Sequence, residues 1–130
     1  MARILIAEDE AHIVRVMSLW LKRNGHDIIE TPNGRAALEV LKKENVDVVI
    51  SDVNMPILDG LGLVKAVRAP EGECQNRDVP FLMLSSRCDQ ALLAKEVEGC
   101  NVSLYPKPFV PSRLVAEIDR LLGATATHDS

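Results

Sequence analysis

Long apolar runs, an excess of basic residues and regularly spaced cysteines are all missing from this 130-residue chain. No apolar stretch approaches the roughly 20 residues that a transmembrane helix needs, and the N-terminal sequence turns acidic after one short apolar run. The chain carries 15 basic and 19 acidic residues, so its net charge of −4 gives no electrostatic reason to approach nucleic acid or an anionic membrane. We therefore expect a soluble, unexported, cytoplasmic protein that binds neither.

Cysteine and histidine are few and do not follow the spacing of metal ligands. Three cysteines form an odd set without a Cys-x-x-Cys pair, which argues against a disulfide framework and a zinc site and favours reduced thiols. The three histidines are scattered along the chain, and we assign no chemistry to them. These residues are Cys74, Cys88, Cys100, His12, His26 and His128.

Short, nearly continuous apolar runs alternate with helical patterns along the chain. Runs at residues 4–7, 48–50 and 81–84 predict strands that are buried on both faces, as in parallel sheets, and residues 28–29 and 102–105 predict two weaker strands. Apolar residues at helical spacing predict helices around residues 13–21, 37–41, 93–97 and 114–122, and Asp59-Gly60 starts a further helix. Five strand-helix units result.

This alternation predicts an α/β protein with a single doubly wound five-stranded parallel sheet. A composition of 47% hydrophobic and 26% charged residues is ordinary for one domain, which we place at residues 1–122. Residues 123–130 are expected to form a flexible C-terminal tail or a truncated linker, and residues 69–78 an irregular segment. We expect Trp20 to pack in the core, and residues 42–44 and Arg68 to be solvated surface.

Polar side chains follow the ends of four predicted strands. Glu8 and Asp9 follow the first strand, Asp52 ends the third, Ser85 ends the fourth, and Lys107 follows the fifth. Each residue alone could be a helix cap, a turn residue or a solvated charge. In open parallel sheets, however, ligands bind beyond the carboxyl ends of the strands. The five residues together therefore predict a functional site at that edge.

Carboxylates at the ends of the first and third strands repel one another if these strands are neighbours. Two unit charges about 5 Å apart at an effective dielectric constant near 20 repel by roughly 3 kcal/mol. Either one carboxyl group takes up a proton, or a hard divalent cation binds among the oxygens. We favour Mg²⁺, because it needs few protein oxygens and leaves coordination positions for phosphoryl oxygens.

Four sequence motifs, AEDE, SDVNMPILDG, MLSS and PKPF, together resemble the signature of the two-component response-regulator receiver domain, the CheY-like family. The similarity covers roughly residues 3–122. The resemblance implies a flavodoxin-like sheet with the strand order 2-1-3-4-5.

The resemblance also implies a function as a phosphoacceptor switch. Asp52 corresponds to the phosphoacceptor, which takes a phosphoryl group from a sensor histidine kinase or a histidine phosphotransfer protein. Lys107 and Ser85 bind phosphoryl oxygens, and Ser85 moves toward the new phosphate. The fourth helix, fifth strand and fifth helix then present the change to a downstream effector or output domain. Such a protein catalyses only its own phosphorylation and dephosphorylation, so we expect that this chain is not an enzyme acting on other substrates.

The resemblance implies Mg²⁺ as the cofactor. Asp9, Asp52 and the backbone carbonyl of Asn54 correspond to the protein ligands, with Glu8 acting through a water molecule. Glu8 stands where many members of the family have aspartate. Arg87 and Asn54 lie at positions that tune access of the hydrolytic water, and we hypothesise that Arg87 sets the lifetime of the phosphate.

The fifth strand departs from the family pattern. Leu104 occupies the position where an aromatic residue is usual, and Tyr105, one residue later, is expected to face the opposite side of the sheet. Pro106 is unusual before the lysine. The resemblance further implies a cis peptide bond between Lys107 and Pro108.

Two other functions compete with the switch. A phosphohydrolase of the haloacid dehalogenase type also uses an aspartate nucleophile and Mg²⁺, but it needs a second aspartate two residues later, where this chain has Asn54. A degenerate receiver that serves as a phosphorylation-independent docking module is suggested by Leu104 and Pro106. The complete set of acids, hydroxyl and lysine at the predicted site argues against it.

Overall fold

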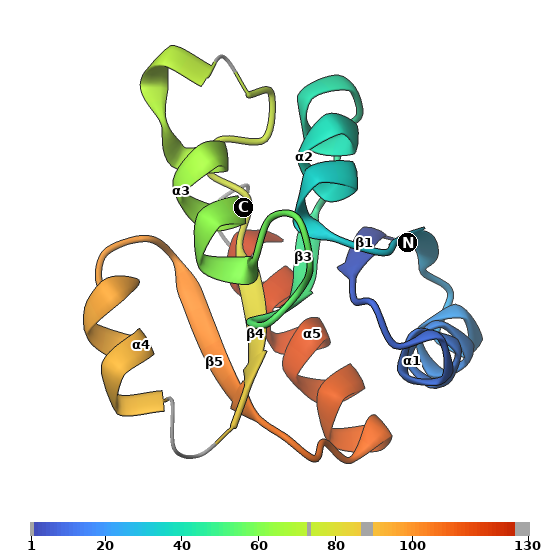
Figure 1. The fold of residues 1–130 in the computed structure, drawn as a ribbon. Helices are drawn as coiled ribbons and strands as arrows, with labels where there is room; N and C mark the ends of the chain where they lie inside the picture. Colours follow the sequence, from blue (N-terminus) through green and yellow to red (C-terminus); the bar gives the residue numbers. More distant parts are fainter. Residues whose placement is uncertain (1, 73, 87–89, 127–130) are drawn as a thin grey trace.

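A computed structural model describes residues 2–72, 74–86 and 90–126. Five parallel strands form one sheet in the order β2-β1-β3-β4-β5, which confirms the order that the resemblance implied (Figure 1). The strands are β1 (Arg3–Ala7), β2 (Asp27–Thr31), β3 (Val48–Asp52), β4 (Phe81–Ser85) and β5 (Val102–Pro106).

Helices connect the strands, as the alternating sequence pattern predicts. They are α1 (Ala11–Arg23), α2 (Gly34–Lys43), α3 (Gly60–Arg68), α4 (Gln90–Glu96) and α5 (Pro111–Ala126), with a short 3₁₀ turn, η1 (Pro70–Gly72), after α3. Asn33 and Asp59 begin α2 and α3 as N-caps, since their side chains accept hydrogen bonds from the amides of Ala36 and Gly62, each at 2.8 Å. None of the described helices is long and apolar enough to cross a membrane.

Helices pack against both faces of the sheet (Figure 1), and an apolar layer lies on each face. Alternate strand residues such as Ile4 and Ile6 pack with α1 and α5, whereas Leu5 and Ala7 pack with α2 and α3. Burial on both faces explains why β1, β3 and β4 appear in the sequence as nearly continuous apolar runs. Trp20 is partly buried against the α1–α5 layer, as expected.

The segment between α3 and β4 was expected to be irregular, but hydrogen bonds anchor it to the end of α2 and to the residues that precede β3. The side chain of Asn76, 9% exposed, donates hydrogen bonds to the carbonyls of Leu41 (2.7 Å) and Glu44 (2.6 Å) and accepts one from the amide of Val46 (3.0 Å). Cys74, a buried free thiol, also donates to the Leu41 carbonyl at 3.3 Å. The amino end of the sheet is thereby tied to the end of α2.

The prediction that Arg68 is ordinary solvated surface is wrong. Its guanidinium is half-buried over the Phe81 ring, 5.2 Å from the ring centroid, and donates to three carbonyl oxygens. The acceptors are Cys100 (2.9 Å), Arg77 (2.7 Å) and Val79 (2.6 Å). Arginine suits this position because its planar fork can serve several carbonyls at once.

Some predictions concern residues for which the structure gives no description. Arg87, Cys88, His128 and residues 127–130 lie outside the described part of the chain. Helix α5 continues to Ala126, so residues 123–126 are helical, four residues beyond the point where we expected a tail to begin. The boundary of the domain at residue 122 stays a prediction.

Candidate functional site

The sheet register brings the predicted site residues to one edge. Because Ala7 of β1 pairs with Ser51 of β3, the residues that follow β1 lie beside Asp52. Ser85 at the end of β4 pairs with Pro106, and its carbonyl accepts a hydrogen bond from the Lys107 amide at 2.9 Å. Adjacent parallel strands thus deliver side chains from four different segments to the same carboxyl edge.

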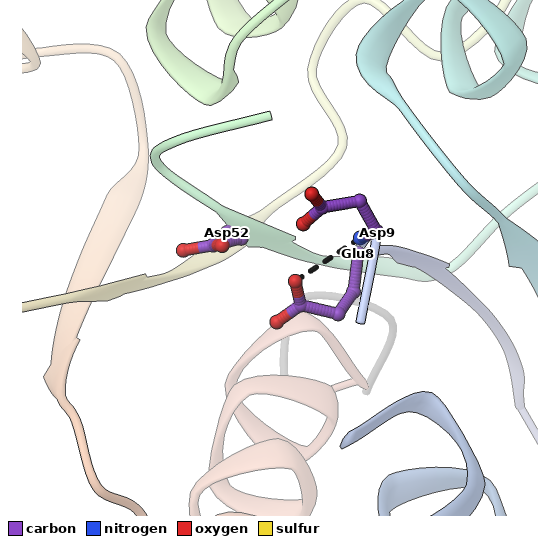
Figure 2. Close-up of side chains that lie close together, drawn as sticks. All are labelled: Glu8, Asp9 and Asp52. Carbon is purple, nitrogen blue, oxygen red and sulfur yellow. Dashed lines mark hydrogen bonds between the residues drawn. The ribbon is translucent and has the colours of Figure 1, made fainter. Parts of the chain in front are cut away.

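Three carboxylates gather at this edge. Glu8 and Asp9 at the end of β1 and Asp52 at the end of β3 each offer an oxygen, and these oxygens all lie within 4.8 Å of one another (Figure 2). Glu8 and Asp52 are buried, with 2% and 6% of their surface exposed, whereas Asp9 is exposed. The cluster therefore has buried oxygens at its base and an opening toward solvent at Asp9.

Lys107 is a cation that faces the acids. Its Nζ lies 2.8 Å from Oδ1 of Asp52 and 3.6 Å from Oε1 of Glu8. Burial by itself would lower the pKa of Lys107, but the hydrogen bond to Asp52 and the negative charges of Asp52 and Glu8 together outweigh burial and raise that pKa. Lys107 therefore stays charged beside Asp52.

Glu8 is the strongly perturbed acid of the cluster. Burial, together with the negative charge of Asp52, raises the pKa of Glu8 to about 7, although Lys107 acts in the opposite direction. Its Oε2 accepts hydrogen bonds from the amides of Asp9 (3.1 Å) and Glu10 (3.4 Å). Its buried Oε1 has no hydrogen-bond partner among the described residues. Buried acceptors of this kind are rare in proteins, so this oxygen is a candidate for contact with a ligand.

Ser85 provides a second buried polar atom of this kind. Ser85 is 2% exposed, and its hydroxyl makes no hydrogen bond within the part of the chain that the structure describes. A buried hydroxyl normally finds a partner. Its location at the end of β4, on the same edge as the acids, makes it available to a ligand bound there.

The loop that follows Asp52 returns tightly to the strand. Asn54 lies two residues beyond Asp52 and is exposed, and its backbone carbonyl as a ligand stays a prediction. The Gly60 amide donates to the Val53 carbonyl at 2.8 Å, and a Cβ atom on Gly60 would overlap the Asp52 carbonyl oxygen. The sequence interpretation of Asp59-Gly60 as the end of the loop and the start of a helix is confirmed.

The fifth strand behaves as its sequence predicts. Leu104 packs with the α2–α3 layer and Tyr105 with the α1–α5 layer, so the two side chains do face opposite sides of the sheet. The peptide bond between Lys107 and Pro108 is cis, as the resemblance implied.

Sequence reasoning missed Thr31 at the end of β2. Thr31 is buried, its carbonyl accepts a hydrogen bond from the Glu8 amide at 3.1 Å, and its hydroxyl donates to the Ile6 carbonyl at 2.8 Å. Thr31 therefore fixes the turn of the chain that delivers Glu8 to the site. The signal was present, because Thr31 is a polar residue that follows a predicted strand, as Glu8 does.

The donor set fits a hard divalent cation. Among the described residues of the site, three carboxylates against one ammonium leave a surplus of two negative charges when all are ionised. Carboxylate oxygens are the ligands that Mg²⁺ prefers, and the buried Oε1 of Glu8 lacks a hydrogen-bond donor. A bound divalent cation would balance the surplus of charge among these described side chains.

Three relatives illustrate what the chain is similar to. The transcriptional regulatory protein PrrA of Mycobacterium tuberculosis is 31% identical over 98% of this chain, and the chain spans about half of PrrA (54%). The chemotaxis response regulator CheY4 of Vibrio cholerae has a TM-score of 0.82 and 33% identity, over 93% of this chain and 98% of that one. The receiver domain of the sensor histidine kinase PA1611 of Pseudomonas aeruginosa, with a magnesium ion coordinated in its active-site cleft, has a TM-score of 0.78 and 26% identity, over 94% and 98% of the two chains.

A family model gives the same result over nearly the whole chain. The model of the response regulator receiver domain matches residues 4–119, which include all of the five strands except Arg3 of β1, and every residue of the site described above. The chain is therefore a member of the response regulator receiver domain family of two-component signalling.

Proposed function

We propose that this chain is a phosphorylation switch that accepts a phosphoryl group on Asp52 in a reaction that requires Mg²⁺. The observation that carries the proposal is the convergence of Glu8, Asp9 and Asp52 within 4.8 Å, with the Lys107 ammonium 2.8 Å from Asp52. A buried structural ion pair would not need three acids for one base.

Phosphoryl transfer needs a nucleophile, charge neutralisation and positioning more than covalent help from the protein. An Asp52 carboxylate oxygen attacks the phosphorus of a phosphohistidine, the N–P bond breaks, and the imidazole leaves with the electron pair. A mixed anhydride forms at Asp52. The Nζ of Lys107 lies 2.8 Å from Oδ1 of Asp52, so the ammonium is close enough to stabilise the negative charge on the phosphoryl oxygens after transfer.

The metal site proposed for Mg²⁺ comprises Asp9, Asp52 and the backbone carbonyl of Asn54, with Glu8 acting through a water molecule. Bound Mg²⁺ supplies charge neutralisation between the acceptor and the phosphoryl group. The magnesium ion in the cleft of the related PA1611 receiver domain supports this assignment. The buried Oε1 of Glu8, which has an ion-pair contact with Lys107 but no hydrogen bond among the described residues, supports a role for Glu8 in the proposed site.

The switch itself is proposed to act through Ser85. Its buried hydroxyl has no described partner, so a phosphate at Asp52 can recruit it without breaking an existing hydrogen bond. We propose that the domain of residues 1–122 receives its phosphoryl group from a histidine kinase or phosphotransfer protein. It would report the change to an effector or output domain through α4, β5 and α5, where Leu92 of α4 is 71% exposed.

Intact-mass measurement after incubation with acetyl phosphate tests the proposal. We expect the wild-type protein to gain the mass of one phosphoryl group with Mg²⁺ and not with EDTA, and Asp52→Asn to gain none. Asp59→Asn is a matched control, because asparagine also caps a helix and Asp59 lies in the same loop. It should keep the adduct.

The same experiment separates the competing functions. A docking module would show no metal-dependent adduct in the wild type, which would overturn the proposal. A phosphohydrolase would turn over a general phosphoester such as p-nitrophenyl phosphate, whereas we propose that this chain acts on its own phosphoryl group only.

A further inference from the structure

The loop between β3 and α3, residues 53–59, contains a strained turn. The amide of Leu58 donates to the carbonyl of Pro56 at 2.7 Å, and Ile57 between them has a φ of 71°. A hydrogen bond across one residue with positive φ is the rare, strained form of the γ-turn. Ile57 is β-branched, and such residues strongly avoid positive φ.

The side chain of Ile57 does not hold this turn in place. It is 79% exposed, so little burial of its own offsets the strain. Strained backbone persists where surrounding contacts fix it, and it gathers at functional sites. The contacts that fix this turn must therefore come from its neighbours.

Gly34, the first residue of α2, makes that contact. Its amide donates to the carbonyl of Leu58 at 3.0 Å. Gly34 is buried, and a Cβ atom on it would overlap the Leu58 carbonyl oxygen and lie 3.0 Å from the carbonyl carbon. These are backbone atoms, which cannot rotate away as the end of a side chain can. The approach of the loop to α2 therefore requires glycine at position 34.

Hydrogen bonds on both sides of the contact between Gly34 and Leu58 fix the position of the loop. At one end, Asn33 caps α2 through its hydrogen bond from the Ala36 amide, which fixes the first turn around Gly34. At the other end, the Gly60 amide donates to the Val53 carbonyl at 2.8 Å. Asn54 lies between these anchors, so a shift of Leu58 must be absorbed by the few residues around it.

We propose that Gly34 is a positioning residue for the metal site. By leaving room for the Leu58 carbonyl, Gly34 lets α2 hold the strained loop, and with it Asn54, where the loop can supply a metal ligand. This inference rests on the proposed function, and it assigns a part in phosphorylation to a helix that contributes no ligand of its own.

Calorimetric titration of the metal-free protein with MgCl₂ tests the role of Gly34. We expect Gly34→Ala to weaken Mg²⁺ binding about tenfold, the effect typical of losing support around a metal ligand. Gly62→Ala is the matched control, because the atoms nearest a Cβ on Gly62 belong to side chains, Cδ1 of Leu58 at 2.7 Å and Oδ1 of Asp59 at 3.1 Å, and side chains can move where backbone cannot. Gly62→Ala should bind Mg²⁺ like the wild type.

A second readout does not depend on the metal. Amide chemical shifts of Asn54 and Ile57 in the metal-free protein should change in Gly34→Ala and stay close to wild type in Gly62→Ala. If Gly34→Ala does not fold alone, it is combined with Ile57→Gly, since glycine accepts positive φ without strain, and compared with Ile57→Gly. In that background the loss of Mg²⁺ affinity should be smaller than tenfold but measurable.

The outcomes separate this inference from the proposed function. Wild-type affinity in Gly34→Ala, or equal loss in Gly62→Ala, overturns the positioning role and leaves the proposed function intact. A wild-type protein that neither binds Mg²⁺ nor accepts a phosphoryl group overturns both.

Discussion

At the amino end of the sheet, buried polar groups have hydrogen-bond partners, whereas at the carboxyl end two buried oxygens have none among the described residues. Arg68 serves three carbonyls, and Asn76 serves two carbonyls and an amide. At the opposite edge, Glu8 and Ser85 each hold a buried oxygen that has no hydrogen-bond partner among the described residues, and the acids outnumber the lysine.

This difference in hydrogen bonding indicates that the amino end of the sheet contributes to stability and the carboxyl end to function. A buried polar group without a partner destabilises the fold, while a satisfied one is nearly neutral or favourable. The hydrogen bonds at the amino end therefore stabilise the domain. At the carboxyl end, we propose that the two atoms without a described hydrogen bond take part in binding a cation and a phosphoryl group. Substitutions at the two ends should accordingly affect different measurements.

The largest effect is expected from Arg68→Ala at the amino end. The substitution leaves three carbonyls without their donor and exposes the Phe81 ring, so we expect the free energy of unfolding to fall by about 3 kcal/mol. Urea denaturation followed by circular dichroism measures the loss. At a temperature where the variant is folded, the rate of phosphorylation by acetyl phosphate should equal that of the wild type.

Arg68→Lys sharpens this prediction. Lysine keeps the positive charge but lacks the planar fork, so it should recover only part of the stability. Full recovery would show that charge alone matters at this position. A loss below about 1 kcal/mol in Arg68→Ala would contradict the contrast between the two ends.

The next effect is a pH dependence at the carboxyl end. The pKa of Glu8 is raised from 4.5 to about 7 in the folded protein, so the folded state binds more protons than the unfolded state between these values. The stability that protonated Glu8 contributes is therefore fully present below pH 4.5 and is lost as the pH rises through 7. In metal-free buffer this loss should be on the order of 2–3 kcal/mol.

Glu8→Gln isolates this contribution, because glutamine has a similar shape and does not titrate. We expect the free energy of unfolding of the wild type to fall relative to that of Glu8→Gln as the pH rises from 5 to 8 in EDTA. Saturating Mg²⁺ should remove the shift, because a cation favours ionised carboxylates. A difference that does not change with pH would contradict the raised pKa.

The same contrast explains what could be predicted from the sequence. The strands, their order and the gathering of Asp9, Asp52 and Lys107 follow from apolar runs that end in polar residues, together with the resemblance to a known family. Arg68 could not be predicted, since its three partners are carbonyl oxygens, and every residue has one. Contacts made to the backbone leave no pattern in the residue types of the partners.

Gly34 shows the same limit at the site itself. In the sequence it is part of an ordinary Asn-Gly turn before a helix, and its contact is with the backbone of Leu58, which lies in another loop. The alternation of side chains along a strand, in contrast, was sufficient to place Leu104 and Tyr105 on opposite faces. Periodic features are therefore predictable from sequence, whereas approaches of backbone to backbone need the fold.

The smallest expected effect on stability comes from removing a buried serine hydroxyl, and it depends on whether that hydroxyl makes a hydrogen bond. Ser85→Ala removes a hydroxyl without a described partner, so the free energy of unfolding should be unchanged or rise by up to about 1 kcal/mol. Ser18→Ala is the matched comparison. Ser18 is also buried, at 5% exposed, but its hydroxyl donates to Oε2 of Glu30 at 2.6 Å, so the substitution should lower the free energy of unfolding by about 1 kcal/mol. Urea denaturation at one pH measures both. If Ser85→Ala lost as much as Ser18→Ala, the Ser85 hydroxyl would already be satisfied in the unphosphorylated protein, and a phosphate at Asp52 would then have to break that interaction before recruiting it.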